Sequence, residues 1–421
     1  MCAWQVDGND FTPMKETKTS IVIVICYFGQ FPWYFEFFLK SVEFNPSVRF
    51  LLFTDQETEY PIPANMELVN MTLKELESLA SVRTNCKVNL SNSYKICDIK
   101  PAYGDIFKDY LADYDFWGHG DLDLIFGNIR SLISEEALSH FDIVNARPEY
   151  ITGFFCLYRN IETINLLYRC SKDYRRVFEG YKYYCFDECS FAQERLWDGE
   201  SIFDQDCEIE SMTHIIKRLS NENVIKADFS LKAVEGTPGN VCWEEGVLIY
   251  KEEYEGLLYH FINFKKNPLS HFPKWRKIPN TYYIEQNYFS KFSPDSLIGK
   301  VIKVRQTVRF KLRKKINSWK LGLDYLISRF SKTPQYFQDE VFSGEYIYEY
   351  GTPVILSKSQ DQIFLSYKNS SFKTNLIHIN NNKFVDFKSK TTYYLKHKPG
   401  LEIELVVAPL NRNSVAYRKY L

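Results

Sequence analysis

Short apolar segments alternate with polar ones along the first two thirds of the chain, and they predict alternating strands and helices. The run Ile21–Phe28 is continuously apolar, rich in β-branched residues and followed by Gly29, which is typical of a parallel strand covered on both faces. Pro32 can open a helix after it, and Thr72–Glu75 has the spacing of a capping box that starts another. The pattern therefore predicts an α/β fold with a mixed, mainly parallel sheet and helices on both faces.

The same patterns give the remaining elements of this part of the chain. Further strands are expected at 50–53, 66–71, 114–118, 142–145, 153–158 and 256–263, and further helices at 95–112, 160–179, 188–197 and 209–219. Pro101 is expected to break the helix at 95–112 or to delay its start.

After about residue 275 the pattern changes. Residues 298–332 hold eleven Lys and Arg against one acidic residue, Asp324, and their apolar positions recur at roughly helical spacing. Two interpretations stay open: a surface helix with a charged face, or a basic amphipathic helix that contains Trp319 and associates peripherally with an anionic membrane. Beyond it, short β-prone runs split by Gly, Asn and Pro predict a small β-rich appendage. We therefore expect four parts: a lead-in at 1–19, an α/β domain at 20–275, a basic helical segment at 276–338 and a β-rich domain at 339–421.

Composition narrows the class of protein. A length of 421 residues suits two or three domains of about 100–200 residues each. The net charge of −1 gives no support to a nucleic-acid partner, and the aromatic share of 17% favours a large aromatic core over stacking surfaces. The 10 cysteines include no CxxC pair, so reduced thiols are expected. No signal peptide is evident, which favours a cytoplasmic location, at the inner face of the cytoplasmic membrane if the basic helix binds lipid.

The candidate chemistry centres on Asp121-x-Asp123. Residues two apart on an extended segment point the same way, so both carboxylates can meet one cation, and oxygen ligands of this kind suit Mg²⁺ or Mn²⁺. His260 ends a late apolar strand and can supply a third ligand, and Lys266 can neutralise a diphosphate. The alternative is a solvated acidic turn with an unrelated core histidine and surface lysine, but the apolar frame around the two aspartates favours the metal site.

These residues resemble a known family pattern. A DxD after a strand with a distal His and Lys is similar to the GT-A glycosyltransferases, specifically the glycogenin and galactosyltransferase-like retaining group. Over roughly residues 20–270 the chain more closely resembles an uncharacterised bacterial family of predicted polysaccharide glycosyltransferases. The segments that carry this closer resemblance are Cys26–Gly29, Phe53–Asp55, Tyr94–Gly104, Tyr114–Asp123 and Phe186–Glu188.

The resemblance implies a GT-A (Rossmann-like) fold and a role for each matching residue. The donor-binding residues are Tyr27 and Asp55 on the base, Asp121 on ribose and metal, Lys266 on the diphosphate, and Lys100 from the matching segment. The metal ligands for Mn²⁺ or Mg²⁺ are Asp121, Asp123 and His260. The acidic pair that faces sugar and acceptor is Asp187 and Glu188, with Asp204 and Asp206 as rivals for that role.

The implied function is a metal-dependent transfer of a hexose from a nucleotide sugar, with a UDP-sugar as the favoured donor, to a surface-polysaccharide or lipid-linked glycan. Metal and lysine would stabilise the leaving diphosphate, and a carboxylate would favour the positive charge at the anomeric carbon. An inverting transfer needs Asp187 or Glu188 as base, whereas a retaining one does not; the His and Lys pair favours retention. Two alternatives stay open: a metal-dependent phosphoesterase or nucleotidyltransferase, and a carbohydrate-binding protein without catalysis.

Overall fold

The computed structural model describes residues 18–90, 93–267 and 269–328 and, beyond them, the eight strands β16 to β23. Residues 1–17 of the expected lead-in and residues 329–338 of the expected basic segment lie outside the described residues. The nine cysteines among the described residues are all free.

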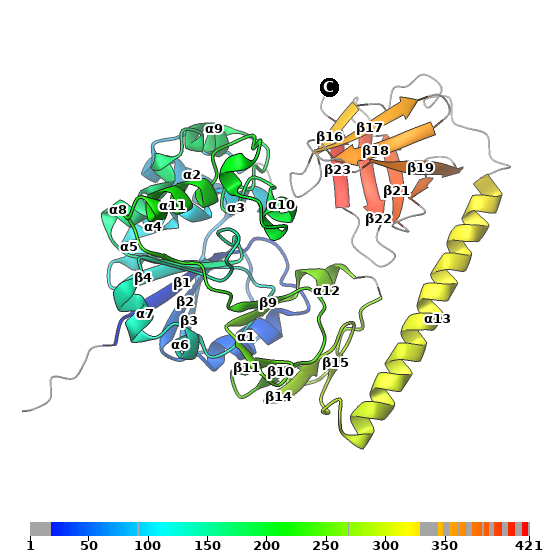
Figure 1. The fold of residues 1–421 in the computed structure, drawn as a ribbon, viewed down its shortest axis with the longest axis horizontal. Helices are drawn as coiled ribbons and strands as arrows, with labels where there is room; N and C mark the ends of the chain where they lie inside the picture. The colour runs from blue at the N-terminus through cyan, green and yellow to red at the C-terminus, as the bar shows by residue number, and fades with distance from the viewer. Residues whose placement is uncertain are drawn as a thin grey trace, which may run out of the picture.

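A seven-stranded sheet forms the centre of the molecule (Figure 1). Its strands, in spatial order, are β3 (Met66–Asn70), β2 (Val48–Thr54), β1 (Ile21–Cys26), β4 (Phe116–Gly120), β7 (Phe155–Arg159), β6 (Ile143–Asn145) and β8 (Ala227–Asp228). Strand β7 runs antiparallel to both of its neighbours, and the other adjacent pairs are parallel. The predicted α/β class with a mixed, mainly parallel sheet is confirmed.

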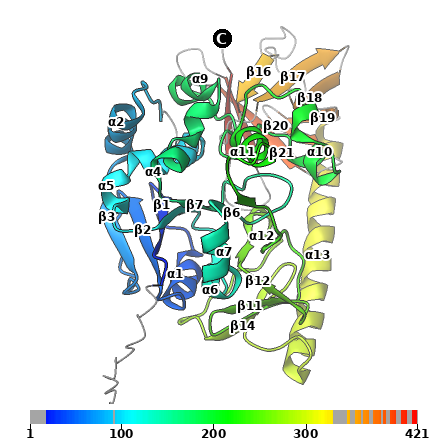
Figure 2. The same cartoon turned by 60° about the vertical axis from the view of Figure 1, so that its left-hand side comes forward.

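Helices cover both faces of this sheet because its central strands are apolar on both sides. Val22 and Val24 of β1 enter one core cluster, while Ile21, Ile23 and Ile25 enter another on the opposite face. The helices of the first face include α2 (Leu73–Thr84), α3 (Ile96–Ile99), α4 (Tyr103–Ile106), α5 (Lys108–Leu111), α8 (Glu162–Asn165), α9 (Tyr174–Glu179) and α11 (Met212–Asn221). Those of the second are α1 (Phe35–Glu43), α6 (Ile129–Leu132) and α7 (Glu135–His140). Figure 2 shows the two groups from the side.

Two small sheets extend the domain beside α1. One consists of β5 (Leu124–Phe126), β13 (Leu258–His260) and β9 (Ala233–Glu235). The other consists of β12 (Tyr254–Gly256), β11 (Val247–Tyr250), β10 (Val241–Glu244), β14 (Thr281–Ile284) and β15 (Phe289–Ser290). Strands β14 and β15 come after residue 275; β14 pairs with β10 and β15 pairs with β14, so this sheet runs past the expected domain boundary. The division of the chain at that residue stays a prediction.

Local signals explain where several elements begin and break. Thr72 and Glu75 form the predicted capping box at the start of α2. The helix expected at 95–112 is divided into α3, a 3₁₀ turn containing Pro101, α4 and α5, because proline cannot supply a helical N–H. The helix expected at 188–197 is shorter than predicted: α10 covers only Gln193–Trp197. The segment expected as one helix at 160–179 contains α8, a 3₁₀ turn and α9.

The C-terminal part consists of one long helix and a closed sheet. Helix α13 (Leu297–Ser328) follows the short helix α12 (Ile262–Lys266) and the strands β14 and β15, and it runs along one edge of the molecule in both views (Figures 1 and 2). The closed antiparallel sheet is formed by β16 (Gly344–Ile347), β17 (Pro353–Ser359), β18 (Gln362–Tyr367), β19 (Lys373–Asn380), β20 (Lys383–Asp386), β21 (Thr391–His397), β22 (Ile403–Ala408) and β23 (Val415–Lys419). The predicted β-rich tail is therefore present.

None of the helices in the described ranges combines the length and the apolar character that crossing a membrane requires.

Candidate functional site

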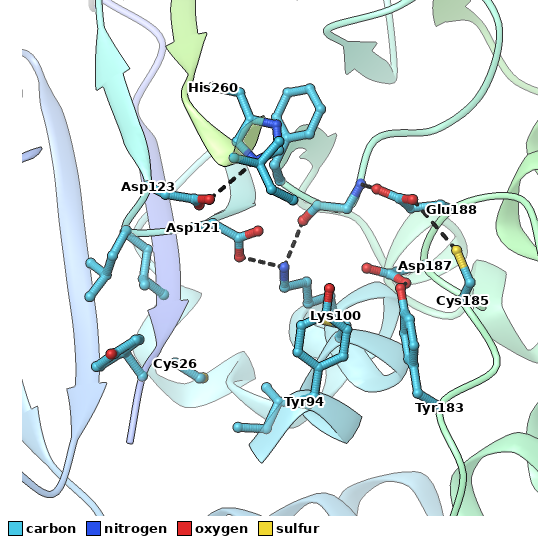
Figure 3. A pocket seen from close by; sticks show the side chains of 18 of the residues that line it. Cys26, Tyr94, Lys100, Asp121, Asp123, Tyr183, Cys185, Asp187, Glu188 and His260 are labelled. Atoms are coloured by element: carbon cyan, nitrogen blue, oxygen red, sulfur yellow. Dashed lines mark hydrogen bonds and ion pairs between the residues drawn. The ribbon is translucent and has the colours of Figure 1, made fainter. Parts of the chain in front are cut away.

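A cleft of about 480 Å³ opens at the edge of the central sheet where β1 and β4 end (Figure 3). These strands are parallel neighbours, so the segments after their carboxyl ends meet at the same edge. Tyr27 and Phe28 follow β1 and line the cleft from one side, and Asp121 and Asp123 follow β4. In open α/β sheets this edge is the usual place for a bound ligand.

Lys100 forms an ion pair with Asp121 inside the cleft. Its ammonium group donates to Asp121 Oδ1 at 2.6 Å and to the carbonyl oxygen of Gly153 at 2.7 Å. The lysine is buried, which alone would lower its pKa, but the charge of Asp121 outweighs burial and keeps the pKa of Lys100 above its ordinary value. The cleft floor therefore carries a fixed positive charge at neutral pH.

Asp123 lies beside His260 because of a strand pairing. Strand β13 pairs with β5 so that His260 is opposite Leu124, and this brings His260 Nε2 within 3.3 Å of Asp123 Oδ2. Lys265, on α12, reaches the same oxygen at 2.6 Å. Burial alone would raise the pKa of Asp123, but Lys265 and His260 outweigh it and hold that pKa well below its usual range. Asp123 is therefore an anion in a buried position.

Glu235 fixes the other side of the His260 ring. Strand β9 runs parallel to β13 with Glu235 opposite His260, and Glu235 Oε1 lies 2.9 Å from His260 Nδ1. Burial would lower the pKa of His260, but the two carboxylates raise it to about 9. Arg147 pairs with the second oxygen of Glu235. A carboxylate behind a histidine sets which ring nitrogen faces the site, and this arrangement is common behind metal-ligating histidines.

The acidic pair Asp187 and Glu188 faces the cleft from the opposite side. Glu188 Oε1 accepts from the N–H of Gly153 at 2.9 Å, and Glu188 Oε2 accepts from Gln193 Nε2 at 2.8 Å. Asp187 Oδ1 accepts from the hydroxyl of Tyr183 at 3.2 Å. Burial and the neighbouring Glu188 raise the pKa of Asp187 well above its usual range, so Asp187 favours its neutral form.

Gly153 joins the two halves of the site. Its carbonyl oxygen binds Lys100 and its N–H binds Glu188. A Cβ at this position would lie 2.3 Å from Asp187 Oδ2 and 3.0 Å from Glu188 Oε1. The acidic groups can therefore approach the backbone this closely only because residue 153 has no side chain.

Most of the predicted site residues line this one cleft. They are Tyr27, Lys100, Asp121, Asp123, Asp187, Glu188, His260 and Lys266. Asp55 is not among the lining residues: it follows β2, and its Oδ1 accepts from the N–H of Gly29 at 3.0 Å, which lowers the pKa of Asp55. The rivals Asp204 and Asp206 are also not among the lining residues.

Three residues of the site were not predicted from the sequence: Glu235, Lys265 and Gln193. Lys265 is adjacent to the predicted Lys266, and only the turn of α12 decides which of them contacts Asp123. Glu235 sits on a three-residue strand, and its partnership with His260 depends on strand register. Gln193 is the first residue of α10, and no local sequence motif predicts its contact with Glu188. A charged residue inside a short apolar strand is the one signal that could have pointed to Glu235.

The donor set suits a hard divalent cation, but its members are not gathered around one point. Two carboxylates and an imidazole backed by Glu235 are ligands that Mn²⁺ and Mg²⁺ accept. Asp121 is turned to Lys100, however, and Asp123 is paired with Lys265 and His260. Within the part of the chain that the structure describes, no group of three or more His, Cys, Asp and Glu side chains is arranged to hold a metal ion.

Comparison with solved structures finds distant likenesses. A galactosyltransferase, LgtC, in complex with donor and acceptor sugar analogs is 11% identical, with 52% of this chain and 76% of that chain covered and a TM-score of 0.25. The apo-form glycosyltransferase GlyE of Streptococcus pneumoniae TIGR4 is 13% identical, with 50% of this chain and 45% of that chain covered and a TM-score of 0.25. Likenesses this distant say nothing about the activity of this chain.

Family assignment rests on a different comparison. No curated protein matches the chain. Residues 23–293 match one family model, and they contain the two small sheets, the whole cleft and all of the central sheet except the first two residues of β1. The chain belongs to the family of unknown function DUF6625.

Proposed function

We propose that this chain is a glycosyltransferase that moves a hexose from a nucleotide sugar to a glycan acceptor. The observation that carries the proposal is the composition of the cleft: three lysines, Asp123 with His260, which Glu235 backs, and a separate acidic pair surround a cavity of about 480 Å³. Positive groups on one side can receive a diphosphate, and carboxyl groups on the other can receive sugar hydroxyls. A site for a single small anion would need only the positive groups and not the carboxyl groups.

The donor would lie over the ends of β1 and β4. Lys100, Lys265 and Lys266 line the cleft and can stabilise the negative charge that grows on a leaving diphosphate. Tyr27 presents an aromatic ring at the end of β1, where a nucleotide base can stack. We propose a UDP-sugar as donor. Asp55, outside the cleft lining, would reach the base only through the loop that contains Gly29.

Mn²⁺ or Mg²⁺ would be held by Asp121, Asp123 and His260. Bound there, the ion would neutralise charge on the diphosphate. Glu235 would orient His260 so that Nε2 faces the ion, and ion binding would require His260 to give up its proton. Lys265, now on Asp123 Oδ2, would be released toward the diphosphate.

The acidic pair would serve the sugar and the acceptor. Glu188 is held by the Gly153 N–H and by Gln193, so its carboxylate has a fixed direction beside the cleft. Asp187, which favours its neutral form, can donate a hydrogen bond to a sugar oxygen. We propose retention at the anomeric carbon, with the leaving phosphate taking the acceptor proton, and an acceptor that is a surface-polysaccharide or lipid-linked glycan in the cytoplasm.

The test is a panel of nucleotide sugars incubated with the full chain in Mn²⁺, in Mg²⁺ or in EDTA, with release of nucleoside diphosphate and free sugar as the readout. We expect hydrolysis of one UDP-sugar in the presence of metal and loss of at least 100-fold in Asp123→Asn, on the scale of removing a main electrostatic group. Asp206→Asn, an exposed carboxylate outside the cleft, is the matched control. Cleavage of phosphodiesters or mononucleotides without sugar release would instead support a phosphoesterase.

A further inference from the structure

Helix α13 exposes an apolar stripe between Leu297 and Trp319. The large apolar side chains on this stripe are all between 50% and 84% exposed: Leu297, Ile298, Val301, Val304, Val308, Leu312, Ile316 and Trp319. Steps of three and four residues place most of them on one face of a helix. Isolated exposed apolar residues are ordinary on protein surfaces, but a continuous row of them marks an interaction surface.

The opposite face of α13 is turned toward the rest of the molecule. Ile302, Gln306, Phe310 and Arg313 are partly buried and follow the same three-to-four residue spacing on the other side of the helix. The side chains on this face are therefore less exposed than those of the stripe. Helix α13 lies at the edge of the molecule in both views (Figures 1 and 2), and the side chains of its apolar stripe are exposed.

Basic side chains border the stripe on both sides. At 100° per residue, Lys300 and Lys311 fall on one flank and Arg305 and Arg309 on the other. The sequence has no Asp or Glu from 297 to 323, so nothing on the helix neutralises these charges up to Asp324. Over 32 residues the helix extends about 48 Å, which is long enough for many simultaneous contacts with a flat surface.

We propose that α13 lies flat on an anionic lipid surface, with the apolar stripe in the boundary between headgroups and acyl chains and the basic flanks on the lipid phosphates. An anionic lipid surface is favoured because its negative charge complements the basic flanks of the stripe. A second copy of the chain docking stripe to stripe would bring two sets of basic flanks together without acidic partners. The proposal does not depend on the proposed function, because none of its residues lines the cleft.

The experiment is co-sedimentation of the full chain with vesicles of phosphatidylcholine alone and of phosphatidylcholine with 30% phosphatidylglycerol. We expect binding to the anionic vesicles at least tenfold tighter than to the neutral ones, and release of the bound protein in 0.5 M salt because screening removes the attraction. Equal binding to both vesicle types, or to neither, would overturn the proposal.

Charge reversal on the flanks tests the electrostatic half. In the triple variant Arg305→Glu, Arg309→Glu and Lys311→Glu we expect at least a tenfold fall in affinity for anionic vesicles. The matched control makes the same change in charge at exposed lysines away from α13: Lys87→Glu, Lys108→Glu and Lys226→Glu. An equal fall in both triple variants would mean that net charge alone attracts the protein, and the assignment to α13 would fail.

Removing apolar groups from the stripe tests the other half. Val304→Ser, Val308→Ser and Leu312→Ser leave every charge in place, and since these side chains are exposed, the substitutions remove no core contact. We expect weaker vesicle binding with an unchanged circular dichroism spectrum. If the wild-type chain instead sediments as a dimer that these substitutions dissociate, without vesicle binding, a second copy covers the stripe and the membrane proposal is wrong.

Discussion

Gly153 contacts both halves of the cleft, and a substitution there tests the placement of Asp187 and Glu188 directly. In Gly153→Ala the new Cβ would collide with Asp187 Oδ2 and press on Glu188 Oε1, so the acidic pair must move away from the sugar site. Misplacement by about 1 Å costs on the order of 100-fold, so we expect donor hydrolysis to fall by about 10–100-fold. Gly180→Ala, whose Cβ would meet the carbonyl oxygen of Arg176 at 2.8 Å outside the cleft, is the control for crowding alone. Full activity in Gly153→Ala would contradict the placement of the acidic pair.

His260 gives a pH dependence whose sign follows from its partners. In the metal-free protein the folded state holds the pKa of His260 at about 9, above its ordinary value of 6.5. The folded state therefore binds more protons between these pH values, and the free energy of unfolding should fall as pH rises from 6.5 to 9. In Glu235→Gln one of the two carboxylates that raise this pKa is neutral, so the folded-state pKa should be lower, and the fall should be smaller and should end at a lower pH.

Chemical denaturation at a series of pH values measures this slope, and NMR titration of the His260 ring measures the pKa itself. Since other groups titrate in the same range, the difference between wild type and Glu235→Gln isolates the contribution of the pair. Identical slopes and identical ring titrations in the two proteins would show that Glu235 does not act on His260.

At the scale of elements, the short helix α3 connects both sides of the cleft. Asp98 is fully buried, and it accepts from Lys95 Nζ at 2.6 Å and from the N–H groups of Tyr184 and Phe186 at 2.9 Å. These bonds hold the turn that leads into Asp187. The segment from Lys95 to Lys100 therefore positions the acidic pair through Asp98 and Asp121 through Lys100.

Asp98→Asn should therefore destabilise the α/β domain strongly. Removing one charge of a buried pair leaves the other uncompensated, which costs about 3–5 kcal/mol in the free energy of unfolding. The control is Asp109→Asn, which breaks the exposed pair with Arg83 and should cost less than about 1 kcal/mol. Similar losses in the two variants, measured by urea denaturation, would contradict the structural role of Asp98.

The elements that the sequence predicted best are those with strong local signals. The β-branched run of β1 and the capping box of α2 were both predictable because each depends on neighbouring residues. Helix α10 was predicted to begin too early, since the stretch after Glu188 contains Ser190 and Phe191 in left-handed backbone conformations that a helix does not allow. In the site, Asp121 and Asp123 were predictable because apolar residues surround them in the sequence. Glu235 was not, because its contact with His260 depends on the register of β9 and β13.

At the scale of the whole molecule, the chain contains two separate hydrogen-bonded units. Strands β16 to β23 pair with one another in a closed sheet, and the sheets of the α/β part pair only within residues 21–290 over the described ranges. Helix α13 connects the two. Because few elements join these units, we expect at least two unfolding transitions in calorimetry.

A nucleotide ligand should shift only one of these transitions. UDP with Mn²⁺ would bind the folded cleft and not the unfolded chain, so at 100 times its Kd it should stabilise the α/β unit by about 2.7 kcal/mol. The transition of the closed sheet should keep its midpoint, which makes it an internal control in the same scan. Asp123→Asn should abolish the shift, whereas Asp206→Asn should retain it, since Asp206 is outside the cleft. A shift of both transitions together would mean that the units unfold as one, and a shift that survives in Asp123→Asn would place the nucleotide elsewhere on the molecule.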